Sequence, residues 1–451
     1  MLTSFNFRLL QSSIAVLFLA TQACKPANQI GKSASALLLN DSTFINAHTG
    51  ISIYDPQENR YLYNFQAEKY FVPASNTKIV TLYMGMKTLG DRLPGLRYRV
   101  TADTIYLQPT GDPAFLHPDF KDQPVFDFLK QTTLPLAIDA SNWKSKPLGE
   151  GWSWDDYNDD YAPERSAMPV YGNLIKWIQV KDSSSSPNPS STGDNVFIYS
   201  EPEVNWKVNF TNDNDQKTFS VRRAISENEY TIHQGQEPHR EIEVPFVTNG
   251  VQSALELLKD TLHKTIVPTK QTNNDGYTLI AGIHSDSLYR KMMARSDNFF
   301  AEQILLMSAN ERWRVLDEHR TIEDALHGEL KGFPQQPNWV DGSGLSHYNL
   351  FTPFDMVWIL DKMQKEFGMN RVKSLFATGG SGTLRNYFRQ DSGYVYAKTG
   401  TLAGVVALSG YIYTRKNKLL IFSVLVNNHQ SPGGLIRRKV ETFLRKIRDE
   451  Y

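Results

Sequence analysis

The sequence predicts an α+β fold in which an antiparallel sheet is flanked by helices and a long β-rich insertion interrupts the chain. Near the C-terminus, three strand-like runs follow one another closely: residues 395–401, 405–414 and 419–427. The last two are joined by a short turn, which is typical of an antiparallel meander. Helical spacing of apolar residues occurs at residues 75–89 and 297–308, whereas short strand-like runs dominate from about residue 93 to 285.

Length and charge exclude some classes of protein. The chain has 451 residues, which is enough for two or three domains. Lysine plus arginine and aspartate plus glutamate both number 48, so no net field attracts nucleic acid, and no nucleic-acid partner is expected. We expect residues 41–92 and 286–451 to form one domain and residues 93–285 to form one or two nested domains.

The N-terminal residues resemble an export signal. Arg8 supplies a positive start, and residues 14–20 form an apolar run that is too short to span a bilayer. Cys24 closes the expected signal peptide, residues 1–24, and its setting resembles the lipobox of bacterial lipoproteins. We therefore expect an exported, periplasmic protein that is anchored to a bacterial membrane through a lipid on Cys24. The alternative is an ordinary signal peptide with an incidental cysteine.

The first part of the mature chain is expected to be a tether, residues 25–40, followed by a β-hairpin. Because Cys24 is the only cysteine, no disulfide within the chain is expected. Residues 50–54 and 61–65 alternate as two strands of the hairpin. The helix that begins near Ser75 comes next.

The insertion and the second half contain the remaining elements. Six strand-like runs lie in the insertion: residues 97–100, 104–107, 134–138, 196–199, 219–222 and 241–244. Residues 181–193 are rich in serine and proline, cannot form a core, and are expected to be a mobile loop. Further helices are expected at residues 251–262 and 353–366. A C-terminal helix, with apolar positions from residue 435 to 447, would pack on one sheet face.

The first candidate catalytic pair is Ser75 and Lys78. They are three residues apart at the start of a predicted helix, so both lie on one face of its first turn. A serine hydroxyl is a weak nucleophile until a base takes its proton, and a lysine whose pKa is lowered can be that base. Ser141 and Lys144 repeat the spacing, but no helical pattern follows them.

Two further triplets complete the ordered set. Ser296-Asp297-Asn298 opens a strong helical pattern, and Lys398-Thr399-Gly400 lies inside a predicted strand. Ser296 would relay the proton to the leaving amine, and Asn298 would hold an amide of the substrate. Lys398 would keep Lys78 deprotonated and attract a substrate carboxylate.

The same strand supplies two further expected contributions. Gly400 would let the strand backbone approach the substrate, because glycine has no side chain in the way, and Thr399 would also contact the substrate. The backbone N–H groups of Ser75 and Thr401 would form an oxyanion hole. These three motifs in this order are found in β-lactamases and penicillin-binding proteins.

The chain resembles the S13 peptidases, which are D-alanyl-D-alanine carboxypeptidases and endopeptidases of the class C low-molecular-mass penicillin-binding proteins. The resemblance extends from about residue 40 to 445 and includes the blocks at residues 110–113, 151–156, 341–346 and 398–404. It departs from the family where Pro109 and Thr110 replace glycines. The resemblance implies a transpeptidase-like catalytic domain and an acyl-enzyme on Ser75. It also implies peptidoglycan stem peptides as substrates, β-lactams as covalent inhibitors, and no cofactor or metal.

The family resemblance also places recognition of the stem peptide in the insertion. Trp152, Asp155 and Tyr161 are therefore candidates for contacting a diamino acid of the stem. The alternative is that Trp152 and Trp154 are only buried anchors of a β domain.

Two other functions compete with the peptidase. A class A β-lactamase needs a glutamate that activates water, and after residue 298 the matching pattern occurs only at Glu366 to Asn370. A non-catalytic protein that binds penicillin or peptidoglycan would hold the acyl group without turnover. The set of catalytic residues favours the peptidase.

Overall fold

The computed structural model describes residues 29–182, 195–211, 217–271 and 275–451. The expected signal peptide, Cys24 and nearly all of the loop expected at residues 181–193 lie outside these ranges. Among the described residues, no helix is both long enough and apolar enough to cross a membrane.

The fold is α+β, as predicted, and its largest sheet has six strands in the order β14-β15-β16-β17-β1-β2. The strands are β1 (His48–Asp55), β2 (Arg60–Phe65), β14 (Ala377–Thr378), β15 (Val395–Leu402), β16 (Val405–Tyr413) and β17 (Leu419–Asn427). All neighbours are antiparallel, which confirms the predicted hairpin and meander. Strand β1 pairs with β17, so this sheet joins the two ends of the chain. Because β1, β16 and β17 are buried along nearly their whole lengths, helices must cover both faces.

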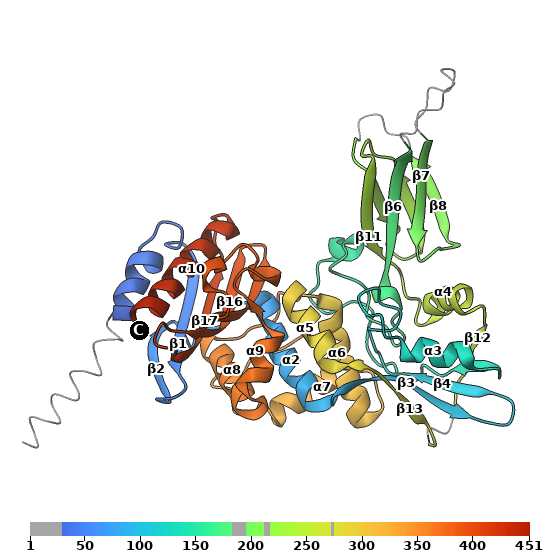
Figure 1. The fold of residues 1–451 in the computed structure, drawn as a ribbon, viewed down its shortest axis with the longest axis horizontal. Helices are drawn as coiled ribbons and strands as arrows, with labels where there is room; N and C mark the ends of the chain where they lie inside the picture. The colour runs from blue at the N-terminus through green and yellow to red at the C-terminus, as the bar shows by residue number, and fades with distance from the viewer. Residues whose placement is uncertain (1–28, 183–194, 212–216, 272–274) are drawn as a thin grey trace, which may run out of the picture.

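One face of this sheet is covered by α10 (Gly433–Glu450) and by the first described residues (Figure 1). Residues 29–34 are α-helical and continue into a π-helix, η1 (Ser35–Leu39). The tether predicted for residues 25–40 is therefore wrong from residue 29 onward. Ile30, Ala34 and Leu38 are four residues apart and buried against α10 and the sheet, so this segment has the apolar stripe of a packed helix.

The other face meets a cluster of six helices. They are α2 (Thr77–Thr88), α5 (Ser285–Arg295), α6 (Asn298–Trp313), α7 (Glu318–His327), α8 (Pro353–Phe367) and α9 (Met369–Leu375). Helix α8 packs directly on β1, β16 and β17. Every residue of α2 from Thr77 to Met86 is buried, because the helix contacts α5, α6 and α8. The candidate motif at its start, Ser75 and Lys78, is thus attached to a closely packed helix.

The middle of the chain contains three further sheets. The first is five-stranded, in the order β12-β5-β4-β3-β13, and the others are β11-β6-β7 and β8-β10-β9. Their strands are β3 (Arg92–Val100), β4 (Ile105–Pro109), β5 (Leu136–Ile138), β6 (Leu174–Asp182), β7 (Asn195–Glu201), β8 (Lys207–Thr211), β9 (Ser220–Arg223), β10 (Glu229–His233), β11 (His239–Pro245), β12 (Ile266–Pro268) and β13 (Thr278–His284). The helices here are α3 (Pro124–Gln131) and α4 (Gln252–Leu262).

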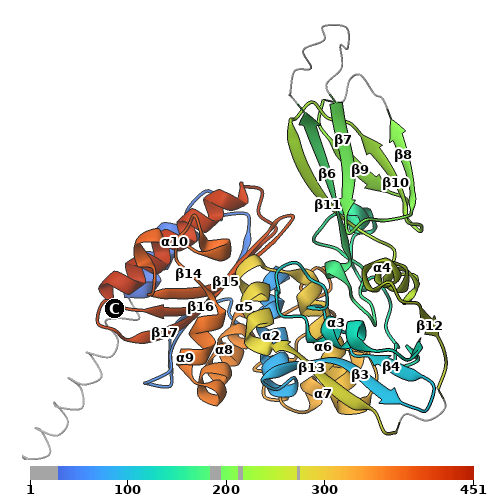
Figure 2. The ribbon, with the colours of Figure 1, turned by 45° about the vertical axis from the view of Figure 1, so that its right-hand side comes forward.

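The first and last strands of this middle part of the chain, β3 and β13, pair antiparallel. The chain therefore enters and leaves the insertion side by side. The two three-stranded sheets project away from the helical part as a separate lobe (Figures 1 and 2). Short 3-10 turns complete the chain: η2 (Ala74–Asn76), η3 (Trp154–Asn158), η4 (Tyr171–Asn173), η5 (Gly382–Leu384) and η6 (Arg389–Asp391).

Candidate active site

Ser75 lies in a 3-10 turn that runs directly into α2, so the serine and Lys78 share the first turns of one buried helix. The preceding residue, Ala74, has a φ of 47°, which is uncommon for a residue with a Cβ. A neighbouring loop holds this turn in place: a Cβ on Gly344 would lie only 1.9 Å from the Ala74 carbonyl oxygen. Glycine at 344 therefore permits the close packing that fixes the position of Ser75.

The Lys78 amine lies between three oxygen atoms. Its Nζ is 2.9 Å from Ser75 Oγ, 2.6 Å from Asn298 Oδ1 and 2.6 Å from the carbonyl oxygen of Ser343. The last two oxygens can only accept hydrogen bonds, whereas the serine hydroxyl can donate. A neutral amine would give its two hydrogens to these acceptors and point its lone pair at the hydroxyl. This geometry is the one that a general base for Ser75 requires.

Burial lowers the pKa of Lys78 to about 8, because the charged ammonium is removed from water. The carboxylates of Asp341, Glu302 and Asp297 act in the opposite direction and limit the fall. Near pH 8, about half of the molecules would therefore hold Lys78 as a neutral amine.

We expect the acylation rate to rise with pH between about 6 and 9, with its midpoint near 8, because only the neutral amine accepts a proton. Glu302→Gln should move the midpoint to lower pH, since the glutamate raises the pKa of Lys78. The measurement is the second-order rate of labelling by a fluorescent penicillin across this range. Glu366→Gln is the control, because Glu366 pairs with Lys87 at the far end of α2. A rate that is flat or falls between pH 6 and 9 would contradict the assignment of Lys78 as base.

Lys398 and Ser296 form a second pair beside the first. Lys398 Nζ donates to Ser296 Oγ at 2.8 Å and to the carbonyl oxygen of Thr399 at 2.7 Å. Ser296 lies in a left-handed conformation between α5 and α6, and Asp297 caps α6 by accepting from the N–H of Phe300. This break in the helix turns the serine hydroxyl toward Lys398.

The electrostatics of the two lysines differ from the sequence expectation. Burial, and not Lys398, is the main cause of the lowered pKa of Lys78. The pKa of Lys398 is itself well below its usual range, first because of burial and then because of the nearby charges of Lys78 and Arg437.

Gly400 allows strand β15 to approach the turn that carries Ser75 closely, a contact that the sequence did not indicate. A Cβ at this position would lie 2.7 Å from the carbonyl oxygen of Pro73 and 3.1 Å from Ala74 Cβ. The glycine therefore lets strand β15 pack against the turn that carries Ser75. Asn76 strengthens this contact, because its Nδ2 donates to the Lys398 carbonyl oxygen at 2.9 Å.

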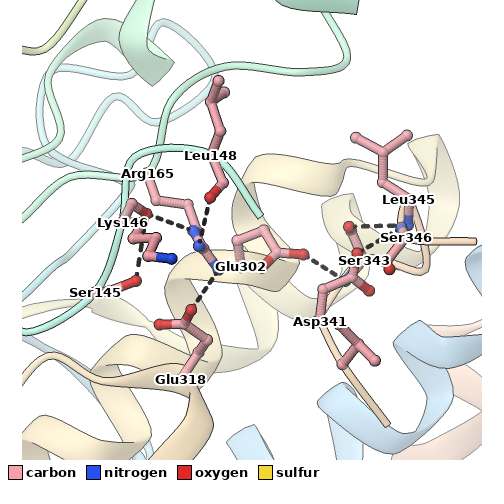
Figure 3. Close-up of polar contacts among 12 residues, drawn as sticks. Ser145, Lys146, Leu148, Arg165, Glu302, Glu318, Asp341, Ser343, Leu345 and Ser346 are labelled. Atoms are coloured by element: carbon pink, nitrogen blue, oxygen red, sulfur yellow. Dashed lines mark hydrogen bonds and ion pairs between the residues drawn. The ribbon is translucent and has the colours of Figure 1, made fainter. Parts of the chain in front are cut away.

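A buried network supports the Ser343 carbonyl that holds Lys78 (Figure 3). Glu302 Oε1 accepts from the Ser343 N–H at 2.7 Å, and its other oxygen lies 3.3 Å from Arg165 Nη1. Arg165 is also 2.9 Å from Glu318 Oε1. Burial raises the pKa of Glu302 to about 7, with a further contribution from Asp341. This network is not predicted from the sequence, although Glu302 follows Asn298 by one helical turn and so faces the same side of α6.

Comparison with known proteins identifies the family. The family model for the D-Ala-D-Ala carboxypeptidase 3 (S13) family matches residues 33–446. The chain belongs to this family. It is 24% identical over 445 residues to the D-alanyl-D-alanine carboxypeptidase of Actinomadura sp. (strain R39), covering 88% of this chain and 81% of that one. It is 21% identical to the D-alanyl-D-alanine carboxypeptidase DacB of Haemophilus influenzae, covering 86% and 87%.

A solved structure confirms the fold of this S13 chain. Penicillin binding protein 4 (dacB) from Haemophilus influenzae superposes with a TM-score of 0.72 at 18% identity, covering 93% of this chain and 99% of that one. The predicted transpeptidase-like fold is therefore confirmed. Family membership likewise confirms the predicted class of enzyme, a serine D-Ala-D-Ala carboxypeptidase, and favours it over a β-lactamase.

The contacts of Glu366 show that this residue does not occupy the place of the water-activating glutamate of a class A β-lactamase. Glu366 lies on α8 and pairs with Lys87 at 3.2 Å and with Lys362 at 2.6 Å. Lys87 is nine residues beyond Lys78 on α2, which corresponds to roughly 14 Å along the helix axis. Glu366 is therefore bound at the far end of α2 from Ser75.

The candidate residues in the insertion lie at different distances from the S13 site. Tyr161 is close, because its carbonyl oxygen accepts from Asn298 Nδ2 at 2.8 Å. Trp152 Nε1 donates to Asp341 Oδ2 at 2.9 Å, so this indole anchors the 341–346 loop. Asp155 and Trp154 lie on an exposed 3-10 turn, and Trp154 is 73% exposed. The alternative that Trp154 is a buried anchor is therefore wrong.

Proposed function

We propose that this S13 enzyme cleaves D-alanyl-D-alanine at the end of peptidoglycan stem peptides through an ester on Ser75. The observation that carries the proposal is the Lys78 amine, which lies between Ser75 Oγ and two oxygens that can only accept. An amine held in this way takes the serine proton as the hydroxyl attacks the scissile carbonyl.

Stabilisation of the oxyanion and protonation of the leaving group would use groups that lie around Ser75. The close packing of β15 on the Ser75 turn supports an oxyanion hole made by the N–H groups of Ser75 and Thr401. Ser296, which accepts from Lys398, passes a proton to the leaving amine of D-alanine. Water then cleaves the ester and releases the shortened peptide. A β-lactam reacts in the same first step: Ser75 attacks the ring carbonyl, the ring opens, and the acyl group stays on Ser75.

The substrate would lie along the open edge of β15. Strand β14 pairs only with Tyr396 and Ala397, so from Lys398 to Leu402 the strand has β16 as its one neighbour among the described strands. The edge of β15 that faces away from β16 is thus available to an extended peptide along this stretch. Asn298 uses one amide hydrogen on Tyr161 and keeps the second for a substrate carbonyl. We propose that Tyr161, Asp155 and Trp152 contact the diamino acid further along the stem.

A time course tests the function against its two alternatives. Purified protein is labelled with a fluorescent penicillin, and release of D-alanine from a stem pentapeptide is measured in parallel. A peptidase keeps the label for long periods and releases D-alanine. Rapid loss of label with hydrolysis of the antibiotic would indicate a β-lactamase, and stable label without D-alanine release would indicate a binding protein. A cross-linked dimeric stem peptide in the same assay reports endopeptidase activity.

We also propose that the enzyme works outside the cytoplasmic membrane, anchored by a lipid on Cys24. The support is the export-like N-terminus and a substrate that lies in the cell wall. Because packed helix begins at residue 29, the chain from Cys24 to the folded protein can span at most about 15–20 Å, less than a tether that ran to residue 40 could span. Stable anchoring needs more than one acyl chain.

The substitution Cys24→Ser tests the anchor. We expect the variant to leave the membrane fraction and to lack lipid by mass spectrometry, with unchanged activity on pentapeptide. Wild-type protein that is wholly soluble, with Cys24 removed or unmodified, would contradict the anchor and leave a free periplasmic enzyme.

A further inference from the structure

Arg437 differs from the other basic residues of the C-terminal helix. Helix α10 carries six lysine and arginine side chains, and five of them lie within 4.0 Å of a carboxylate. These pairs are Arg438 with Glu441, Lys439 with Asp41, Lys446 with Glu450, and both Arg445 and Arg448 with Asp391. Within the described part of the chain, no carboxylate pairs with Arg437, although its side chain is half-buried and its Nε is buried without a hydrogen-bond partner. A partly buried guanidinium without a carboxylate partner in the protein is available to bind an anionic group of a ligand.

The guanidinium of Arg437 is held beside the catalytic strand. Its Nη2 donates to Thr401 Oγ1, three residues after Lys398 on β15. Arg437 and Thr399 also line one small cavity between α10 and the sheet. Thr401 is exposed and lies on the stretch of β15 that has an open edge, so a ligand on that edge would meet both the hydroxyl and the arginine.

Two hydroxyls and two basic side chains, Lys398 and Arg437, thus lie at one end of the site. Thr399 and Thr401 are two residues apart on a strand and share one face, while Lys398 points to the other face and donates to Ser296. The positive charge of Arg437 also lowers the pKa of Lys398. The ligand chemistry that fits such a group is a single carboxylate, which a guanidinium can bind through two parallel hydrogen bonds.

We propose that Arg437 is a specificity-determining residue that binds the α-carboxylate of the leaving D-amino acid. The inference rests on the proposed peptidase function and deepens it. Lys398 supplies a hydrogen-bond donor on one face of β15, Arg437 supplies the positive charge on the other, and Thr401 accepts from the guanidinium at the strand edge. Substrates whose leaving group ends in a free carboxylate would then be preferred over the same substrates with that carboxylate masked.

Two matched pairs of substrates test this inference. The first pair is the thioester of an N-acyl-D-alanine with thioglycolate, which bears the carboxylate, and the same compound as its methyl ester. The second pair is benzylpenicillin and its methyl ester, for which labelling of Ser75 is measured. Arg437→Gln should lower kcat/KM and the labelling rate for the acids by about 10- to 100-fold, as expected for loss of a charge-assisted pair, and those of the esters by less than about threefold. Arg437→Lys should recover part of the loss.

Arg438→Gln is the matched control, because it removes the same charge from the next residue of α10. Its partner is Glu441 and not a group of the site, so all four rates should stay within about threefold of wild type. Thermal unfolding of each variant reports whether the helix still packs. Equal losses for acids and esters in Arg437→Gln, or none for either, would overturn the inference and assign Arg437 a structural role. A wild-type enzyme that does not discriminate acids from esters would overturn it as well.

Different results would contradict the proposed peptidase function and the proposed role of Arg437. If the wild type prefers the acids, and loses that preference in Arg437→Gln, but releases no D-alanine from pentapeptide, then the carboxylate site stands and the peptidase function is wrong. If pentapeptide is cleaved and the acid preference survives in Arg437→Gln, then the function stands and the inference is wrong.

Discussion

Replacing Ser75 by alanine is expected to abolish covalent labelling by penicillin and to reduce D-alanine release by a factor on the order of 10⁴ or more. The reason is that no other described hydroxyl lies at hydrogen-bond distance from the Lys78 amine. Labelling is followed by intact-protein mass spectrometry, and the adduct is mapped by digestion. D-alanine release is measured with the stem pentapeptide.

The Ser75→Ala protein should remain folded. Ser75 is partly exposed, and the hydrogen bond from Lys78 links it only to the site, so the midpoint of thermal unfolding should change by no more than a few degrees. Ser141→Ala is the control, because Ser141 and Lys144 repeat the spacing without a helix. An adduct mapped to the peptide around Ser141, or full labelling of Ser75→Ala, would refute the assignment.

Replacing Lys78 by methionine should slow acylation by a factor of about 10² to 10⁴ for every substrate, since the general base is lost. Methionine fills a similar volume, but Asn298 Oδ1 and the Ser343 carbonyl lose their donor. Each unsatisfied acceptor costs roughly 1–3 kcal/mol, so some loss of stability accompanies the loss of rate. The measurement is the labelling rate with benzylpenicillin and with its methyl ester.

The two substrates distinguish Lys78 from the residues that bind the carboxylate. Loss of the base should slow both compounds equally, whereas loss of a carboxylate-binding cation should slow mainly the acid. Lys87→Met is the control, because Lys87 is on the same helix and pairs with Glu366 away from the site. A decrease of less than about tenfold, or one confined to the acid, would contradict the role of Lys78.

The predicted elements that the structure confirms are those with strong local periodicity. Strands β15, β16 and β17 and helices α8 and α10 begin and end within a few residues of the predicted limits. Their alternation or apolar stripe reflects burial that the local sequence encodes. Other elements were not predicted, including β6, β8, β10, β13 and the helices α3, α5, α7 and α9, although α3 and α7 do have an apolar stripe. The limits of the domains, at residues 92 and 286, stay a prediction.

The N-terminal segment shows why local composition can mislead. Residues 29–39 follow a leader-like stretch and contain several small polar residues, so they were predicted as a tether. Their stability as a helix comes from burying Ile30, Ala34 and Leu38 against α10, which lies about 400 residues away in the chain. No window of the sequence contains that partner.

The candidate catalytic motifs can be recognised in the sequence alone, whereas the way in which they would act depends on the tertiary structure. The proposed nucleophile, its lysine and the other two motifs are recognisable because each is a short run of residues whose order along the chain reflects one chemistry. The hydrogen bonds that orient Lys78 come from Asn298 and Ser343, which are 220 and 265 residues away. The burial that lowers its pKa depends on the whole packed domain, and the contact of Arg437 with Thr401 depends on how α10 lies on the sheet. Such contacts are made by chain folding across long separations, so only the three-dimensional structure reveals them.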